Sequence, residues 1–504
     1  AFALAAAAGL FRNMIIGRTF GIGAGLDAYY AAFKLPDLLF TIVAGGALAT
    51  AFIPVFADFL AADERAGAWQ LASAVTNWVV LVVGVLASLA AILAPWLVRT
   101  VIAPGFDPAQ QAETASIMRI ILLSTVIFGV SAVQGSVLHG FQHFLFPALA
   151  PIIYPLSIAA AALWLVPTWG VRGLAIGAVI GALLHLLIKV PALLYYGFRW
   201  WPVLSAGRGS VRRVAWLMGP RVLDLGVFHL SLLATTNLAS RLGAGSVSAL
   251  EWGWDAMQLP ETIIGTAFGL VAFPTLAVLA ARHDHTGLRH TLGESLRTVL
   301  ALAVPAAVAL ILLGRPLLAL LYQRGEFDAA ATEAVYVALR FYALGLAGHT
   351  CLELAARAFF ALQDTITPLW LAAASAALSI GLGLVLMRSL GYGGLALANS
   401  IAITLEVIAL LLILGRRIGG VEGRATALSL LRTLAASAAM AAAVLVVAGV
   451  AERAGWSNLM TLAACGAAGG VAYLAAARLV RLDALWRFAA ALTGKSSSEP
   501  AITF

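Results

Sequence analysis

Charged residues are scarce in this sequence, at 11% of 504 residues against roughly 25% in a typical soluble protein. Only two cysteines occur, Cys351 and Cys465, and their isolated positions in apolar runs indicate neither a disulfide framework nor a metal site. The chain lacks a phosphate-binding glycine loop and a nucleophile–base pattern, so we expect no enzymatic activity and no cofactor. It also lacks a cleavable signal peptide, and because it begins at Ala1 without methionine we expect residues to be missing from its start.

Hydrophobic residues are correspondingly abundant, at 62% of the chain. Most of the sequence divides into apolar runs of about 20 residues or more, which is long enough for a helix to cross a bilayer. The expected spans are residues 1–20, 28–57, 69–99, 114–139, 145–167, 172–198, 213–241, 249–280, 292–322, 331–361, 366–388, 392–415, 425–450 and 457–480. The net charge of +8 then reflects arginines that hold loops against anionic lipid rather than nucleic-acid binding.

The distribution of basic residues predicts an orientation for these spans. If the N-terminus is inside, the inner loops and the tail carry fifteen lysines and arginines, from Arg65 to Lys495, whereas the outer loops and their edges carry six. The positive-inside rule therefore places both termini of this multi-pass membrane protein in the cytoplasm.

An internal repeat organises the chain. Matching residues lie 221 positions apart, as in the pairs Pro95 and Pro316, Gln142 and Gln363, and Gly173 and Gly394. Each copy holds six spans, and an even number makes the two copies parallel, which is typical of transporters that bind substrate between two lobes. We therefore predict an all-α polytopic membrane protein with about fourteen transmembrane helices, in which two parallel six-helix repeats form two lobes. The expected divisions are 1–199 for the first lobe, 200–212 for a cytoplasmic linker, 213–417 for the second lobe, 418–481 for two extra helices and 482–504 for a disordered cytoplasmic tail.

Charged side chains within the first two spans mark a candidate site, because ionisable groups in a bilayer are costly unless they face protein or water. Arg12 is either a structural arginine that snorkels or a phosphate contact, and Arg18, nearer the outer edge, is structural or a gate ion-pair partner. Asp27 either caps the second span or forms a gate ion pair with a basic residue. Lys34 and Asp37 share a helix face, so they can neutralise one another until Lys34 engages an anion.

The second copy carries a polar face at the corresponding place. Asp255, Gln258 and Glu261 are spaced three residues apart, which indicates either a polar turn at the membrane edge or partners for the basic residues of the first span. Arg357 and Asp364 flank the inner end of the tenth span and are interpreted as a gate or loop-locking pair.

A third set of polar residues is considered for coupling to an ion. His185 and Glu406 occupy equivalent repeat positions in apolar runs, where each is either a satisfied buried group or a proton-coupling site. Asn237 and Asn399 could supply oxygen ligands to a monovalent cation, although the eleventh span offers no carboxylate. Coupling to a cation or to the membrane potential therefore stays open.

Five stretches of the chain form a recognisable set: Gly9–Gly21, Asp27–Pro36, Ala51–Pro54, Gln258–Pro260 and Arg357–Pro368. Together they resemble the lipid II flippase family (MurJ, also called MviN) of the multidrug/oligosaccharidyl-lipid/polysaccharide exporter superfamily. The resemblance implies fourteen helices in two lobes, alternating access, a cationic cavity for a pyrophosphate and a lipid-tail groove beside the last two spans. The chain departs from the family at Ala6, Phe40 and Asp255, where relatives often carry arginine.

The resulting hypothesis is an inner-membrane flippase that moves undecaprenyl-pyrophosphate-linked peptidoglycan precursor, lipid II, to the outer leaflet. Arg12 and Lys34 would hold the pyrophosphate, while Asp255, Gln258 and Glu261 would complete or reset the pocket. Expected partners are lipid II or a related glycolipid, membrane lipids and the cell-wall synthesis machinery. The alternatives are a flippase for another lipid-linked oligosaccharide, a cation-coupled small-molecule antiporter, and a non-transporting scaffold.

Overall fold

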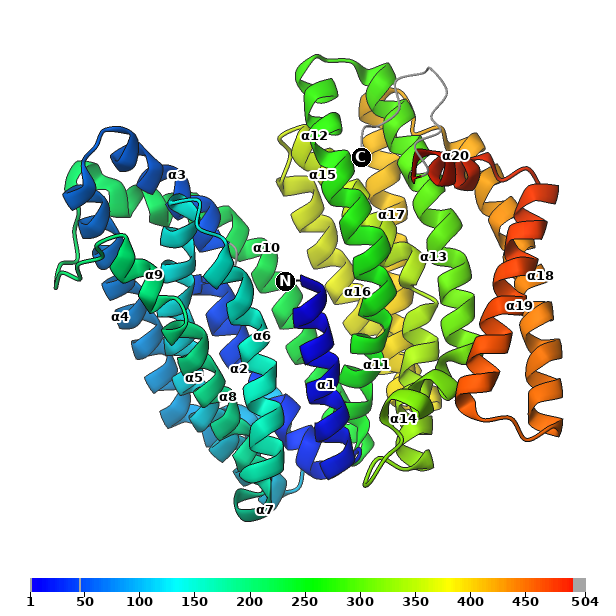
Figure 1. Ribbon diagram of the computed structural model, residues 1–504, viewed down its shortest axis with the longest axis horizontal. Coiled ribbons are helices and arrows are strands. Elements are labelled where there is room, and N and C mark those ends of the chain that lie inside the picture. Colours follow the sequence, from blue (N-terminus) through cyan, green and yellow to red (C-terminus); the bar gives the residue numbers. More distant parts are fainter. Residues whose placement is uncertain (1, 45–46, 493–504) are drawn as a thin grey trace. The chain divides into compact units, whose positions relative to one another are not determined.

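The computed structural model describes residues 2–44 and 47–492 and consists of helices joined by short loops, with no strand in these two ranges (Figure 1). The chain forms two compact units. Unit 1 comprises Ala1–Ser248 and the short segment Arg324–Asp328, and unit 2 comprises Ala249–Gln323 and Ala329–Phe504. The prediction of an all-α polytopic protein is confirmed for the described residues.

Unit 1 is built from long helices and a few short ones. In chain order they are α1 (Phe2–Phe20), α2 (Ala24–Ala44), α3 (Ala47–Ala61), α4 (Arg65–Leu97), the π-helix η1 (Val98–Ile102), α5 (Pro108–Gly140), α6 (Leu145–Trp164), α7 (Val166–Trp169), α8 (Val171–Leu187), α9 (Val190–Tyr195), the 3-10 turn η2 (Gly207–Gly209), α10 (Ser210–Ala239) and the 3-10 turn η3 (Ser240–Leu242). Helix α2 packs on α5 and α10, and α1 packs on α6.

Unit 2 begins within α11, and its helices follow the same alternation of long and short elements. They are α11 (Ser246–Glu261), the π-helix η4 (Thr262–Thr266), α12 (Ala267–Ala281), α13 (His285–Tyr322), α14 (Ala329–Ala343), α15 (Leu346–Ala361), α16 (Ile366–Leu390), α17 (Tyr392–Ile418), α18 (Gly423–Arg453), α19 (Asn458–Leu479) and α20 (Asp483–Leu492). The extra pair α18 and α19 is fastened to α13, because the Tyr473 hydroxyl donates to the Ala301 carbonyl and Met440, Val444 and Cys465 are buried beside it.

Ten helices of the described residues are long and apolar enough to cross a membrane, or eleven if α14 and α15, which meet at a bend of 47°, form one span. The expected count of fourteen is therefore not reached by apolarity alone. The three other expected spans coincide with α1, with α2 and α3, and with α10. Charged residues such as Arg12 in α1 and Lys34 in α2 lower the hydropathy of these two helices, whereas α3 is apolar but too short to cross a membrane alone.

Unit 1 contains two equivalent contacts, each between a loop of one repeat copy and a helix end of the other. The loop at Gly105 packs on the end of α10, where the Gly105 amide donates to Ser240 Oγ at 3.1 Å. The equivalent loop of the second copy packs on the end of α1, where the Glu326 amide donates to the Arg18 carbonyl at 3.0 Å. Asp27 and Ser248, themselves 221 positions apart, are also hydrogen-bonded to each other within unit 1.

The linker is held against α4, and the tail differs from expectation. Residues after Trp200 are bound to α4, because Asn77 Nδ2 donates to the carbonyls of Trp201 and Val203 and Trp78 Nε1 donates to that of Leu204. The expected disorder after residue 481 is wrong for its first part, which forms the amphipathic helix α20. Lys495 and the other residues of 493–504 lie outside the described residues.

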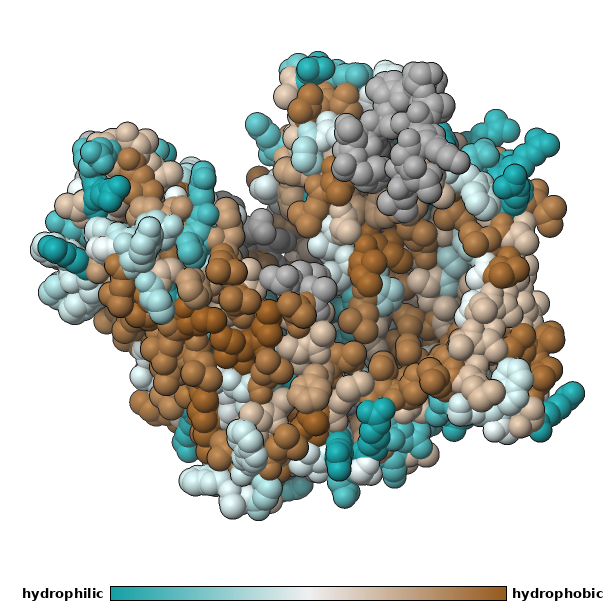
Figure 2. All heavy atoms as spheres, viewed as in Figure 1, coloured by the Kyte–Doolittle hydropathy of each residue, from teal (hydrophilic) through white to brown (hydrophobic). Residues whose placement is uncertain are grey.

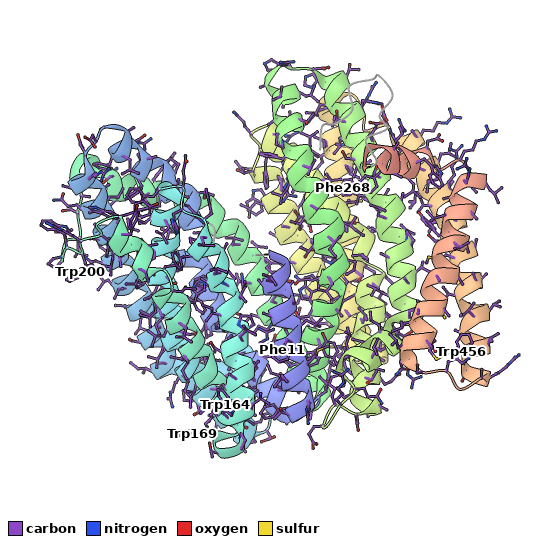
Figure 3. All side chains as sticks on the ribbon, viewed as in Figure 1. Phe11, Trp164, Trp169, Trp200, Phe268 and Trp456 are labelled. Atoms are coloured by element: carbon purple, nitrogen blue, oxygen red, sulfur yellow. The ribbon has the colours of Figure 1, made fainter. Side chains whose placement is uncertain are left out.

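The surfaces match a lipid environment. On the visible face of unit 1, hydrophobic residues form a band over the middle of α5, α6 and α8 (Figure 2). Exposed tryptophans lie at both ends of this unit, with Trp164 and Trp169 at one end and Trp200 at the other (Figure 3). Tryptophan favours the two membrane–water interfaces, so these side chains bracket the hydrocarbon layer.

Candidate functional site

Arg12 is the first cation of the predicted site. It lies half-buried on α1, and its Nε and Nη2 donate to Asn13 Oδ1 at 3.0 and 2.8 Å, so the buried Asn13 orients the guanidinium through one edge. The buried Tyr29 on α2 and the half-buried Tyr154 on α6 lie within electrostatic range of both Arg12 and Asp37. Unit 1 thus brings two of the predicted site residues, Arg12 and Asp37, to one polar region.

Lys34 lies on α2 and is buried, with 8% of its surface exposed, whereas Asp37 one turn later is exposed. His229 of α10 lies within electrostatic range of Lys34, and its Nε2 is hydrogen-bonded to Thr41 Oγ1 at 2.9 Å. Lys34 is thus a buried basic residue of α2 close to α10.

Asp27 is fully buried, and its carboxylate accepts hydrogen bonds at the start of α11. Oδ2 accepts from the Gly245 amide at 2.6 Å, while Oδ1 accepts from the amide and the hydroxyl of Ser248, both at 2.7 Å. The first amides of a helix have no partner within the helix, and a carboxylate there also favours the helix dipole. Through these three bonds, Asp27 of α2 caps the start of α11. They run neither to the start of α2 nor to a basic side chain.

Unit 2 gathers two acids and one arginine around the end of α11. Arg357 and Glu353, one turn apart on α15, form an ion pair at 2.7 Å, and both lie within electrostatic range of Glu261. Arg357 also packs tightly against α12, because a Cβ at Gly269 would lie 1.7 Å from its Nη1. Gly269 was missed from the sequence, and so was the pairing of Glu353 with Arg357, although a spacing of four residues on a helix indicates an ion pair.

The two other predicted residues of α11 are Asp255 and Gln258. Both are half-buried and lie on the same helix face as Glu261. Trp254 of this helix packs edge-on against His349 at 5.1 Å, and His349 Nε2 is hydrogen-bonded to Asn399 Oδ1 at 3.1 Å. Asn399 is thus engaged by an imidazole.

Asn237, near the end of α10, uses both atoms of its side-chain amide in hydrogen bonds. Its Nδ2 donates to the Val101 carbonyl at 2.6 Å and its Oδ1 accepts from Arg241 at 3.0 Å. No group of three His, Cys, Asp or Glu side chains in the described parts of the chain is arranged to hold a metal ion.

Asp364 lies in the loop before α16 and does not pair with Arg357, so the expectation of a mutual pair is wrong. Asp364 Oδ2 accepts from Arg417 at 2.5 Å, and its carboxylate also caps α16 through the Thr367 amide and hydroxyl. Burial alone would raise its pKa, but the bonds from Thr367 and Arg417 prevail and lower the pKa of Asp364 to about 2. The pair therefore ties the α15–α16 loop to the end of α17.

His185 is half-buried in unit 1, where it belongs to a polar cluster with the buried residues Ser131 and Lys189. Its Nδ1 is hydrogen-bonded to Ser131 Oγ at 2.8 Å, and the buried Lys189 donates to the Ser131 carbonyl at 2.6 Å. Lys189 was not predicted as part of a site, because a lysine near the end of an apolar run is typical of a snorkelling residue. Glu406, the repeat counterpart of His185, is also buried, on α17.

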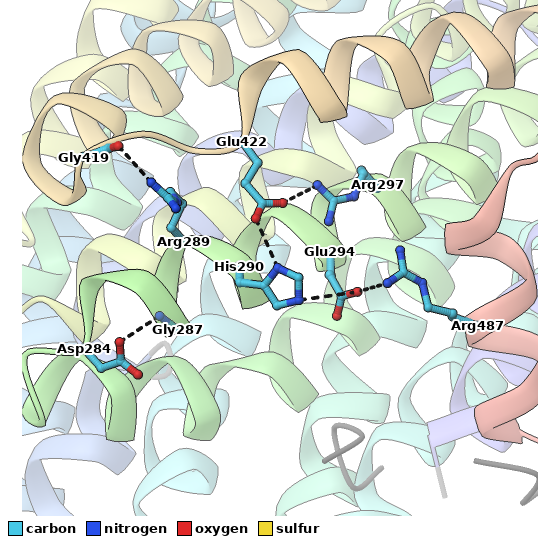
Figure 4. A network of polar contacts seen from close by, with 9 residues as sticks. All are labelled: Asp284, Gly287, Arg289, His290, Glu294, Arg297, Gly419, Glu422 and Arg487. Carbon is cyan, nitrogen blue, oxygen red and sulfur yellow. Dashed lines mark hydrogen bonds and ion pairs between the residues drawn. The ribbon is translucent and has the colours of Figure 1, made fainter. Parts of the chain in front are cut away.

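A polar network at one end of unit 2 joins three segments (Figure 4). Glu422, before α18, accepts from Arg297 at 2.6 Å and from His290 at 3.1 Å, both on α13. Arg487 of α20 donates to Glu294 of α13 at 2.5 Å. Burial opposes the charge of Glu422, but the bonds from Arg297 and His290 lower its pKa below the usual value. The network therefore fixes α18 and α20 to α13.

A family model and individual relatives both match most of this chain. The family described as "Lipid II flippase MurJ" matches residues 16–465. A lipid II flippase MurJ of Burkholderia cenocepacia is 31% identical over 425 residues, which are 82% of this chain and 81% of the relative. A probable lipid II flippase MurJ of Thermotoga maritima is 29% identical over 394 residues, covering 78% of this chain and 79% of the relative.

Solved structures share the fold. A lipid II flippase MurJ in an inward closed conformation has a TM-score of 0.79 at 22% identity and covers 96% of this chain and 98% of its own. An inward-facing multidrug resistance transporter of the MATE family, within the MOP superfamily, has a TM-score of 0.71 at 16% identity and covers 84% of this chain and 96% of its own.

Proposed function

The chain belongs to the lipid II flippase MurJ family, and from this premise we propose that it moves lipid II from the cytoplasmic to the outer leaflet of the bacterial inner membrane. The observation that carries the proposal is the family match across residues 16–465. The protein is a multi-pass transporter rather than an enzyme, and lipid II or a closely related polyprenyl-pyrophosphate glycolipid is its substrate. Cell-wall synthesis enzymes that consume lipid II are its expected partners.

Arg12, assisted by Lys34, would bind the pyrophosphate. A guanidinium can donate two parallel hydrogen bonds to phosphate oxygens, and Asn13 already fixes the orientation of this one. Lys34 would add a point charge from a buried position. In unit 2, Glu261 and Glu353 share the charge of Arg357, and a change in that sharing would accompany substrate release.

Energy for the cycle would come from a monovalent cation, from protons or from the membrane potential. The cluster of His185, Ser131 and Lys189 supports a proton-linked step, because it places two basic groups on one serine within the membrane. Both termini would face the cytoplasm. In intact cells, an impermeant thiol reagent should then label Asp107→Cys and leave Arg65→Cys unlabelled, and the reverse pattern would overturn this orientation.

Rescue of cells depleted of their own lipid II flippase tests the main proposal. The parental chain should restore growth and shape, and outward transport of lipid II should be measurable in the same cells. A chain that reaches the membrane at normal levels and restores neither would contradict lipid II transport.

Arg12 gives the sharpest residue test. We expect Arg12→Ala to abolish rescue and Arg12→Lys to restore it in part, because charge-assisted hydrogen bonds contribute about 1.5–3 kcal/mol, or about one to two decades in affinity. Arg18→Ala, at the exposed end of the same helix, is the matched control. If Arg12→Ala transports at the parental rate while expressing normally, the pyrophosphate role fails.

A second candidate is a flippase for another lipid-linked oligosaccharide. It is favoured by Phe40, which stands where relatives often carry arginine and whose ring instead packs on Phe128 at 5.7 Å. Phe128 in turn packs on Tyr154 and His185, so an aromatic cluster replaces the charge. Asp255→Arg separates the two candidates, because it should preserve or raise lipid II binding in a lipid II flippase and abolish activity in a pocket rebuilt for a different glycan.

A further inference from the structure

Unit 1 contains a cavity that the proposed transport function does not use. Its volume is about 690 Å³, within the ~300–1,000 Å³ range of small-molecule sites. One wall is a stripe of α4 that includes Val75, Val79 and Val82, and the opposite wall is a stripe of α10 that includes Val214 and Met218. Both stripes follow helical periodicity, so two apolar helix faces meet here without filling the space between them.

The roof of the cavity is the linker that precedes α10. Leu204 and Ala206 line the cavity from this segment, while its backbone is held on α4 by Asn77 and Trp78. Ser73 adds a further bond, because its Oγ accepts from the Trp201 amide at 3.1 Å. These hydrogen bonds hold the linker on α4 whether or not the cavity is occupied. The cavity is therefore preformed.

Among the described residues that line the cavity, Arg212 is the one cation, and its exposure marks the mouth of the cavity. Arg212 is exposed and lines the cavity, and it makes no ion pair with any residue in the described ranges. The adjacent Arg213 differs, since it pairs with Asp58 at 2.9 Å. Every other lining side chain except Ser205 is apolar, which gives the cavity the polarity of an amphiphile: a long apolar interior with a single positive group at its opening.

Exposed tryptophans place this mouth at a membrane interface. Trp200, Trp201 and Trp216 flank it in the chain and are 59%, 40% and 80% exposed. Indole rings gather at the level of the lipid headgroups, and anionic headgroups attract basic residues there. Water inside such a cavity would lack hydrogen-bond partners, whereas an acyl chain needs none.

We propose that this cavity binds one acyl chain of an anionic phospholipid, with the phosphate of the same lipid held by Arg212. Guanidinium pairs with phosphate through a bidentate fork, which suits a headgroup at the mouth. The site would clamp the linker between α9 and α10 to the membrane. It does not depend on which lipid-linked substrate the protein carries.

Native mass spectrometry of the purified full-length chain tests the proposal, with phosphatidylglycerol and phosphatidylcholine titrated separately after delipidation. We expect one phosphatidylglycerol to bind about tenfold tighter than phosphatidylcholine. Arg212→Gln should remove that preference, and Arg282→Gln, an exposed arginine of unit 2, should keep it. If Arg212→Gln keeps the tenfold preference, the headgroup assignment is wrong.

Filling the cavity provides an independent arm. Ala215→Phe, from an exposed position that lines the cavity, should abolish binding of both lipids, and Met218→Phe serves if the first variant folds poorly. Unchanged binding in a folded variant would show that the chain lies elsewhere. If undecaprenyl phosphate binds there and phosphatidylglycerol does not, the occupant is the transported lipid's tail and the proposal is overturned.

Discussion

Removal of the Asp27 carboxylate should loosen the start of α11. Asp27→Ala leaves the Gly245 amide and the amide and hydroxyl of Ser248 without their acceptor, and all three groups belong to buried residues. One buried donor without a partner costs about 1–3 kcal/mol, and loss of a helix cap costs about 0.5–2 kcal/mol. Because the variant also removes a buried charge, which offsets part of this loss, we expect a net destabilisation of about 2–4 kcal/mol.

Asp27→Asn should lie between the parent and alanine, at about 1–2 kcal/mol. The amide oxygen can still accept both bonds from Ser248, but its NH₂ group would face the Gly245 N–H, so one bond is lost. Thermal unfolding in detergent measures the order parent, asparagine, alanine, with Asp37→Ala on the exposed face of the same helix as control. An alanine variant as stable as the parent would refute the capping role.

Three further predictions concern charge and packing. The pKa of Asp364 is lowered to about 2, so its pair with Arg417 should stabilise the fold by on the order of 1 kcal/mol above pH 4. This contribution should be lost as the pH falls from about 4 towards 2. Acid unfolding of Arg417→Gln should therefore lack this step. Gly269→Ala should displace Arg357, cost about 1–3 kcal/mol and reduce transport, whereas Gly466→Ala, with open space around it, should be tolerated; equal behaviour of the two variants would contradict the close packing. Lys189→Met should keep or raise the melting temperature, because it removes a buried ammonium, yet flatten the pH profile of transport; an unchanged profile would assign Lys189 to structure.

Much of the architecture follows from patterns that are local or periodic. Apolar run lengths predict the helices, and the constant repeat spacing relates the loop at Gly105 to the loop at Glu326, which make equivalent contacts in the structure. The ion pair of Glu353 and Arg357 could also have been predicted, since a spacing of four places both on one helix face.

Other parts of the site could not be predicted, because they depend on which distant segments meet. Asp27 is recognisable as a helix-capping residue, but that it caps a helix 218 positions away is a tertiary fact. Asp364 and Arg417 are 53 positions apart, and a nearer arginine, Arg357, gave the wrong partner. The lining of the cavity in unit 1 combines α4 with a linker that has no periodicity of its own, so the chain offered no pattern from which to foresee it.

Helix α11 starts in unit 1 and continues in unit 2, because Ser248 is the last residue of one and Ala249 the first of the other. Because Asp27 holds the first turn of this helix, its start is fixed and a tilt displaces its far end most. From Ser248 to Glu261 it spans roughly 20 Å at 1.5 Å per residue, so a tilt of about 10° at the cap sweeps Glu261 through about 3 Å. A displacement of that size exceeds the tolerance of an ion pair, so a small tilt would suffice to make or break electrostatic contact between Glu261 and Arg357.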